Sequence, residues 1–360
     1  MTGRERTLRA LSFLPTDRVP IAGGLLNNWE LLAEVAEADD FWAEPRRHVF
    51  EAFRRLGCDA ILGPVMPKHP ESMTEGEAGR ATGFTKVAAV DPVGTPEGVA
   101  ERAASAPSPG EVRRSSNQQA AYDEYLRLMV DGQREAGDML LIPHCLGYAP
   151  HFPTSTGEFE YEAFLMACAL YPESMARLFA SWAERSRLRL EAVARATVEH
   201  DLLRLIWIGT DLCGRNGPVL SPALLERLYF PGLARAIEPL KQAGIRVVWH
   251  CDANYRRILP QMIAPGIDGF QGFYEEEDGI QLEGLAKMKA ASGDPLILFG
   301  SVLTWGPLAR GTSDDVRRDV DRCLAVARGR GGLLLAPSSS IGPEAPKANV
   351  LAMYQHAQVM

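Results

Sequence analysis

The 360-residue chain lacks the features that mark membrane proteins, nucleic-acid-binding proteins and secreted disulfide scaffolds. No window has the roughly 18 uninterrupted apolar residues that a membrane-spanning helix requires. Lysine and arginine form no long block and the net charge is -8, which argues against a nucleic-acid surface. The 6 cysteines are scattered without a CxxC pair, a usage typical of a reducing compartment. We therefore expect a cytoplasmic protein with neither a membrane nor a nucleic-acid partner.

The sequence also lacks the common phosphate-binding and nucleophile motifs. No GxGxxG or GxxxxGK[ST] follows an early strand pattern, so nucleotide binding of the familiar kinds has no motif support. Three serines stand together at Ser338 to Ser340, but no nucleophile-elbow sequence surrounds them, which makes a Ser-His-Asp triad a poor interpretation. The composition, with 46% hydrophobic and 23% charged residues, is that of an ordinary globular protein with ample core.

The most informative stretch that is present runs from Ile245 to Asn254 and reads IRVVWHCDAN. A run of β-branched and aromatic residues stops abruptly in polar ones, as in a buried parallel strand whose carboxyl end meets solvent or substrate. Residues two apart on a strand point to the same face, so His250 and Asp252 can enter a site together while Cys251 packs into the wall. The alternative is that Asp252 only orients His250 by a hydrogen bond.

Eight short apolar segments alternate with helical patterns, and this order predicts a single-domain α/β protein, a (β/α)8 TIM barrel. A doubly wound sheet is the alternative. Residues 68–115 are richer in Gly, Pro, Glu and Ser, which predicts an excursion between strands two and three, a hairpin or lid with a possible strand at Thr85–Val90. The predicted strands are Val19–Gly24, Cys58–Gly63, Asp138–Pro143, Leu205–Gly209, Ile245–Asn254, Ile267–Gln271, Pro295–Gly300 and Gly332–Ala336.

In such a barrel the polar residues at the carboxyl ends of the strands meet at one mouth, where they can form a pocket. We expect Asp211 to act as a general base or substrate anchor there, or else to cap the loop around Gly214. Arg215 could hold a carboxylate or phosphate, or be solvated or paired structurally. The further residues expected to contact substrate are Asn28, Ser301 and Ser339. His144 and Tyr148 could also contact substrate, or they could fill the loop after strand three.

Landmarks along the whole chain resemble the uroporphyrinogen decarboxylase superfamily. They are TGRER from Thr2 with DRVP from Asp17, GPVLSP from Gly217, HCD from His250, APSSSIGPEAP from Ala336, and the stretch Asn349–Tyr354. The resemblance implies a (β/α)8 barrel and one of two activities. These are decarboxylation of the acetate arms of uroporphyrinogen and methyl transfer to or from corrinoid proteins.

Where the sequence departs from the decarboxylases, the resemblance favours the methyltransferase branch. Decarboxylases of this family carry an early arginine-rich clamp and an aspartate after the second strand, whereas this chain has GGLLNN from Gly23 and then Gly63-Pro64. An octa-anionic substrate needs paired guanidinium groups. We therefore expect a decarboxylase only for a smaller, less anionic acid. A non-catalytic barrel that binds a tetrapyrrole or a corrinoid partner is the third possibility.

The resemblance bears on metal binding as well. Coenzyme M methyltransferases of this family hold zinc through His-x-Cys at the fifth strand and a distant cysteine after the eighth. Here His250 is kept, Asp252 stands at the second ligand position and Ser338 to Ser340 stand near the third. Zinc bound through thiolates is thus doubtful, although His250, Asp252 and Glu275 could form a histidine–carboxylate set. Glu275 also begins a charge run that could simply be solvated.

The resulting hypothesis is a methyltransferase that works with a separate corrinoid protein, since no corrinoid-binding DxHxxG module occurs in the chain. The methyl group would move between a small methoxy or methylamine-type compound and the corrinoid. His250 and Asp252 would polarise or protonate the leaving heteroatom, directly or through a metal, and Asp211 would position the donor.

Overall fold

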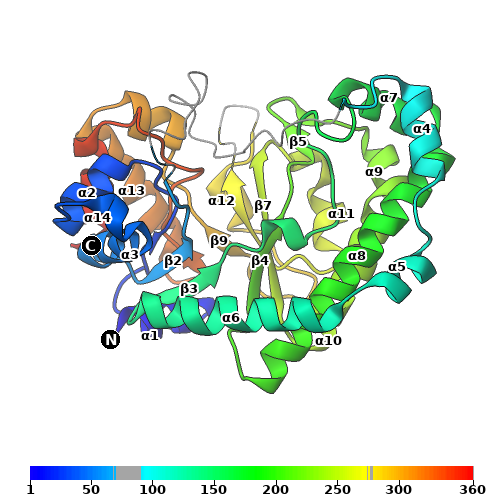
Figure 1. Cartoon of the computed structure of the whole chain (residues 1–360). Helices are drawn as coiled ribbons and strands as arrows, with labels where there is room; N and C mark the ends of the chain where they lie inside the picture. The colour runs from blue at the N-terminus through cyan, green and yellow to red at the C-terminus, as the bar shows by residue number, and fades with distance from the viewer. Residues whose placement is uncertain (68, 70–90, 274, 276–278, 360) are drawn as a thin grey trace.

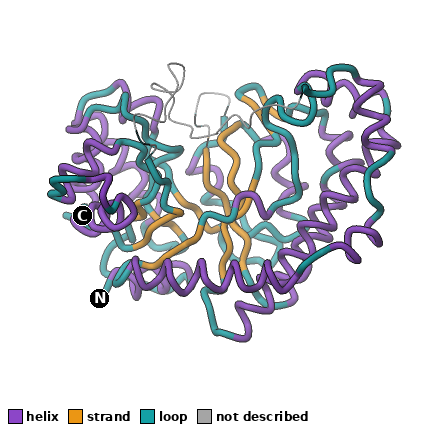
Figure 2. Tube along the Cα trace, in the orientation of Figure 1, coloured by secondary structure: helices purple, strands orange, loops and turns teal. Residues whose placement is uncertain are grey.

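The computed structural model describes residues 1–67, 69, 91–273, 275 and 279–359, and it has an α/β fold. Parallel strands lie in the centre and helices surround them (Figures 1 and 2). The strands are β1 (Ala22–Gly23), β2 (Ala60–Gly63), β3 (Leu140–Pro143), β4 (Leu205–Gly209), β5 (Cys213–Gly214), β6 (Gly217–Pro218), β7 (Arg246–Ala253), β8 (Gly269–Phe273), β9 (Ile297–Phe299) and β10 (Leu333–Leu334).

The strands form two parallel sheets in which neighbours in space follow one another in sequence. One sheet has the order β1-β2-β3 and the other the order β10-β9-β8-β7-β4, while β5 and β6 form a small antiparallel hairpin. Isolated parallel bridges join the sheets at both sides, Ile21 with Leu335 and His144 with Trp207. A doubly wound sheet would reverse its strand order at a switch point, and the described strands show no such reversal. The predicted α/β fold with parallel sheets of the barrel type is confirmed.

Several of the helices that cover the strands begin at a capping residue. Asn28, Thr95, Asn117, Ser221 and Thr312 each cap a helix with the side-chain oxygen, as these residue types commonly do. The helices are α1 (Gly3–Leu11), α2 (Trp29–Ala36), α3 (Pro45–Arg55), α4 (Pro96–Ala104), α5 (Pro109–Ser115), α6 (Gln118–Ala136), α7 (Tyr161–Leu170), α8 (Pro172–Glu199), α9 (Pro222–Leu228), α10 (Phe230–Gln242), α11 (Leu259–Ile263), α12 (Leu282–Leu285), α13 (Ser313–Ala327) and α14 (Lys347–Gln358). Short 3-10 turns occur at η1 (Phe41–Ala43), η3 (Leu146–Tyr148) and η4 (Arg256–Ile258), and a π-helix at η5 (Thr304–Leu308).

None of the described helices is long and apolar enough to cross a membrane. The excursion predicted for residues 68–115 is described only from residue 91 onward, apart from His69, and that part carries α4 and α5. The possible strand at Thr85–Val90 lies outside the described residues.

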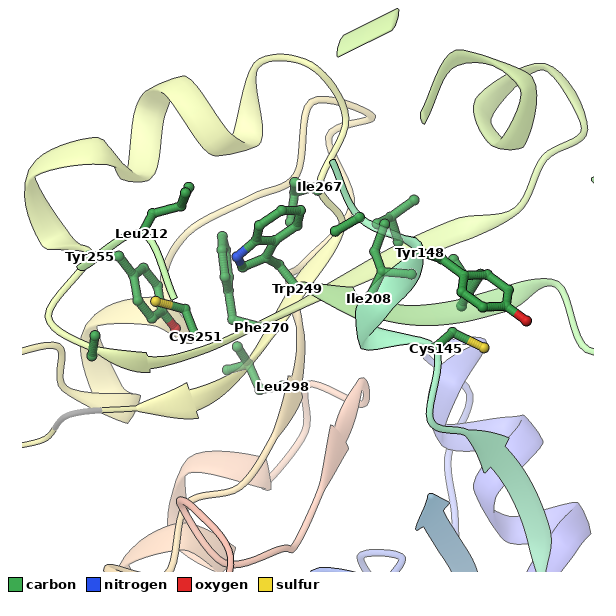
Figure 3. Packing of buried hydrophobic residues seen from close by; sticks show 14 of the residues in the cluster. Cys145, Tyr148, Ile208, Leu212, Trp249, Cys251, Tyr255, Ile267, Phe270 and Leu298 are labelled. Carbon is green, nitrogen blue, oxygen red and sulfur yellow. The ribbon is translucent and has the colours of Figure 1, made fainter. Parts of the chain in front are cut away.

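Two apolar clusters pack on the two faces of the strands. The inner cluster draws on β1, β2, β3, β4, β7, β9 and β10, with side chains such as Leu62, Ile142, Trp207, Val248 and Phe299. The larger cluster fills the layer between the strands and the helices. Figure 3 shows part of it, with Trp249, Phe270 and Cys251 along neighbouring strands. Members of the two clusters alternate along β2, β3, β4 and β7, as the two-residue period of a strand requires.

A buried carboxylate ties the amino-terminal segments to these strands. Asp59 immediately precedes β2 and is 2% exposed. It pairs with Arg6 of α1 and with Arg18, each at 2.5 Å, and accepts a hydrogen bond from the Ile21 amide at 2.9 Å. Arg6 also pairs with Asp17. The two amino-terminal landmarks, TGRER and DRVP, therefore meet at one buried ion-pair cluster.

Removing the carboxylate of Asp59 should destabilise the fold strongly. In Asp59→Ala two largely buried guanidinium groups and one buried amide lose their shared acceptor. We expect the free energy of unfolding, measured in urea, to fall by about 3 to 5 kcal/mol. Asp17→Ala is the matched control, because Asp17 is 47% exposed, and it should lose less than about 1 kcal/mol. Equal losses in the two variants would contradict the central role of Asp59.

Candidate active site

The candidate site lies at the carboxyl ends of the strands, on the same face as the inner cluster. Val248 belongs to that cluster, while Trp249, Cys251 and Ala253 belong to the outer one. His250 and Asp252 therefore point inward, although the pairing of β7 with β8 shifts in register after His250. Ile142 of the same cluster leads to His144 in the same way. This end of a parallel barrel is where active sites are built.

His250 is fixed in one orientation by Gln271 of β8. Its Nδ1 lies 2.5 Å from Oε1 of Gln271, and Nε2 of the same amide donates to the Ser338 carbonyl at 3.3 Å. Because the amide nitrogen is already used as a donor, the amide oxygen must accept, and Nδ1 of His250 must carry the proton. The other ring nitrogen, Nε2, is therefore the one left for a ligand or substrate.

An aromatic wall lies beside His250. The indole of Trp207 on β4 stands edge-on to the rings of both His250, at 5.8 Å between centroids, and His144, at 5.5 Å. The wall removes water from the His144 imidazole, which keeps contact with solvent on one side, and this desolvation lowers its pKa; the nearby His250 adds a smaller effect in the same direction. Both predicted histidines thus face one site.

Asp252 is a carboxyl with a raised pKa at this end of the strands. Its Oδ2 accepts a hydrogen bond from the Ser339 hydroxyl at 2.6 Å, and its backbone amide donates to Oδ1 of Asp211 at 3.0 Å. Although 29% of its side-chain surface is exposed, desolvation raises its pKa, and the neighbouring Asp211 acts in the same direction. His250, whose Nδ1 is 3.9 Å from Oδ1, and Ser339 partly oppose this.

The position of Asp252 depends on a glycine and on the loop after β10. Gly272 has a φ of +86°, and a Cβ there would lie 2.5 Å from Oδ1 of Asp252 and 2.8 Å from the Cys251 carbonyl oxygen. Only glycine permits this approach at that φ. On the other side, the Thr304 hydroxyl accepts a hydrogen bond from the Ser339 amide at 3.1 Å, which holds the serine that binds Asp252.

Several predicted substrate contacts have other partners in the structure. Asn28 is buried and caps α2 through the Leu31 amide. Arg215 is exposed in the turn between β5 and β6.

The Tyr148 side chain lies away from the mouth, between α6 and α8. Its hydroxyl donates to Glu124 at 3.3 Å and Arg189 stacks on its ring at 4.0 Å. In Figure 3 it lies with Cys145, on the outer side of the strands. Tyr148 therefore does not join the predicted group of site residues. The local sequence does not reveal this position, because the charged partners of Tyr148 lie on helices that are distant in the chain.

Glu275 also differs from its expected position as a metal ligand. Its carboxylate is buried and pairs with Arg322 of α13 at 3.0 Å. Ser301 lies beside this pair, with its carbonyl accepting from Arg322 at 2.9 Å. Among the residues that the structure describes, no group of three or more His, Cys, Asp or Glu side chains could hold a metal ion. His250 and Asp252 alone do not provide the donor set of a zinc site.

The sequence reasoning overlooked Gln271, Trp207 and Thr304, which position the predicted residues. Gln271 is 1% exposed at an alternate position of an apolar strand, and a buried amide there always needs partners. That signal was available in the sequence, because no other polar residue interrupts Gly269–Phe273.

The comparisons with known proteins agree with this architecture. Residues 154–359 match the sequence profile of the uroporphyrinogen decarboxylase (URO-D) family. The chain belongs to this family. Among solved structures, a methyltransferase from Methanosarcina mazei is similar at a TM-score of 0.63 and 18% identity, over 100% of this chain and 99% of that one. At this identity the likeness shows a shared fold. No curated protein sequence matches the chain.

The two neighbours of Asp252 should shift its pKa in opposite directions. Ser339→Ala removes a hydrogen bond that stabilises the carboxylate, so the pKa of Asp252 should rise. Asp211→Asn removes a like charge, so the pKa should fall. The side-chain carboxyl carbon of Asp252 can be titrated by 13C NMR in aspartate-labelled protein, with Asp252→Asn used to assign the signal. Shifts in the same direction would contradict this account of the site.

Proposed function

We propose that the protein is a methyltransferase that moves a methyl group between a small methoxy or methylamine-type compound and a separate corrinoid protein. The observation that carries the proposal is the pair at the end of β7. His250 is locked with its proton on Nδ1, and Asp252, two residues on, has a raised pKa. His250 offers a ring nitrogen that can accept a hydrogen bond, and Asp252 offers a carboxyl that keeps its proton to higher pH. Together such groups can bind the donor and protonate the heteroatom that loses the methyl group. Family membership and the fold of the archaeal methyltransferase support the same class.

In the proposed reaction the reduced corrinoid cosubstrate supplies the electron pair for a new bond between its cobalt and the methyl carbon, while the bond between the methyl carbon and its heteroatom breaks. The electron pair of that bond stays on the heteroatom. Asp252, protonated to a higher pH than an ordinary carboxyl, donates a proton to it, so that no uncompensated alkoxide or amide anion forms. Nε2 of His250 accepts a hydrogen bond from an O–H or N–H of the donor where it has one. Asp211, which already holds the Asp252 amide, positions the donor.

The geometry suits a partner that covers the mouth. We infer that the eight parallel strands act as one closed ring, which the two bridges and the shared inner cluster support. In a closed ring the carboxyl ends of all strands form one mouth, where a corrinoid protein can reach His250. Trp305 in η5 follows β9 near this end and is 53% exposed.

A decarboxylase of a smaller, less anionic acid is the second candidate, and the family match is the observation that favours it. In that case Asp252 would protonate the carbon from which carbon dioxide leaves. Release of carbon dioxide from aromatic or tetrapyrrolic acids, without any change in the spectrum of the corrinoid, would favour this activity over methyl transfer.

Replacing His250 should abolish transfer and leave the fold intact. In His250→Ala the donor loses the nitrogen that orients it, and we expect the rate to fall at least about 100-fold. The assay follows the visible absorption of reduced cobalamin mixed with a panel of methoxy and methylamine donors. His356→Ala is the matched control, because His356 pairs with Asp321 on the outer helices. Retained activity in His250→Ala would refute this assignment.

The pH dependence should report the protonation of Asp252. Transfer from donor to corrinoid needs the acid form, so kcat/KM should decline as pH rises through the raised pKa of Asp252. Ser339→Ala should move this decline to higher pH, since loss of the Ser339 hydrogen bond raises that pKa further. Asp252→Asn should be slow at every pH and lack the decline. An unchanged profile in Asp252→Asn would assign the proton donor elsewhere.

A further inference from the structure

A second cavity lies at the opposite end of the strands from His250. It has a volume of about 330 Å³ and is bounded by the segment from Phe13 to Pro20, which leads into β1, and by the loop from Arg328 to Gly331, which leads into β10. In a parallel arrangement these are the amino-terminal ends of the strands. Neither the family match nor the proposed function assigns a role to it.

The loop that forms one wall is fixed by close contacts with Phe13. Gly331 has a φ of +64°, and a Cβ there would lie 2.8 Å from Cα of Phe13; a Cβ at Gly332 would lie 2.5 Å from the Phe13 ring. The Gly332 amide donates to the Ala10 carbonyl at 2.8 Å, and Arg246 stacks on the Phe13 ring at 5.3 Å. The wall is therefore held by backbone and ring packing, which favours a pre-formed cavity.

The cavity is lined by arginines without any carboxylate among its lining residues. Arg18 is neutralised by Asp59. Arg330 donates from Nη2 to the Leu296 carbonyl at 2.6 Å, but its buried Nε and Nη1 have no hydrogen-bond partner. Arg328 is exposed and has no ion-pair partner among the described residues. Because a guanidinium stays charged in proteins, the buried N–H groups of Arg330 need an acceptor.

A cavity of similar size elsewhere makes the contrast clear. Between α5, α8 and α10 a cavity of about 360 Å³ is also lined by arginines, but Glu184 and Glu238 line it with them. Arg113 and Arg187 each pair with Glu184 there. Arginines of that cavity thus have carboxylate partners among its lining residues. Among the described residues, no carboxylate lines the cavity of Arg328 and Arg330.

We propose that the cavity bounded by Phe13, Arg328 and Arg330 binds a small organic carboxylate with an apolar body. The carboxylate would pair with Arg328, and the Arg330 side chain would turn so that its N–H groups, which are buried without a hydrogen-bond partner among the described residues, reach the same oxygen atoms. Guanidinium groups match the geometry of a carboxylate. The apolar body would pack against the hydrophobic lining, which includes Phe13, Leu14, Val19, Leu324 and Leu333. The volume is at the lower end of that of small-molecule sites, which suits an acid of one ring and excludes a nucleotide.

Calorimetric titration of the full chain with sodium benzoate tests the proposal. We expect saturable binding of benzoate at one site. Benzyl alcohol, which lacks the carboxylate, and inorganic phosphate, which lacks the apolar ring, should each bind at least about tenfold more weakly. Equal binding of phosphate and benzoate would overturn the role of the apolar body. Absence of saturable benzoate binding would overturn the site itself.

Variants locate the binding. Arg330→Gln and Arg328→Gln should each weaken benzoate binding about tenfold or more, and the exposed Arg328→Gln keeps the test open if Arg330→Gln fails to fold. Arg185→Gln, on the outer surface of α8, is the matched control and should bind as the unchanged chain does. His250→Ala should also bind normally, since it lies at the other end. Binding that survives in both arginine variants, or that is lost in His250→Ala, would overturn the proposal.

Discussion

The carboxylate of Asp59 is the constraint on which the amino-terminal half of the fold depends. Its side chain joins Arg6 of α1 to Arg18 and the Ile21 amide, and its carbonyl accepts from the Leu140 amide at 2.9 Å. One residue therefore connects the first helix and the first three strands. A buried charge with several partners is costly to disrupt even when its net contribution to stability is modest. We regard it chiefly as a device that sets which segments are neighbours.

The same device recurs in the second sheet. Asp268 immediately precedes β8, pairs with Lys241 of α10 at 2.5 Å and accepts from the Val247 amide at 2.7 Å. In both cases an aspartate before a strand binds a backbone amide of the preceding strand and a cation from a covering element. This pairing fixes the register of the strands, and the inward positions at their far ends follow from it.

Much of the fold could be predicted because apolar runs and helix caps are local signals. Seven of the eight predicted segments contain an observed strand, and Ile267–Gln271 overlaps β8, although β1 and β10 are only two residues long. The two-residue period also predicted His250 and Asp252 on one face, and the structure joins the predicted Ser339 to Asp252 by a hydrogen bond from the loop after β10. Tyr148 and Glu275 could not be placed from sequence, since what directs their side chains is a pair of cations, Arg189 and Arg322, far along the chain.

The two ends of the strands differ in the sign of the charge that their side chains present. This difference favours different ligands at the two ends. At the mouth, burial raises the pKa of Asp252 and the neighbouring Asp211 adds to this effect, so that end favours the protonated carboxyl and neutral groups. At the other end, the cavity is lined by Arg18, Arg328 and Arg330 and, among the described residues, by no carboxylate. Asp59 pairs with Arg18, whereas Nε and Nη1 of Arg330 have no partner in the described part of the chain. A negatively charged ligand is therefore disfavoured at the mouth and favoured at the far end. Because the strands between them are packed with apolar side chains, the two ends can bind different molecules without competition.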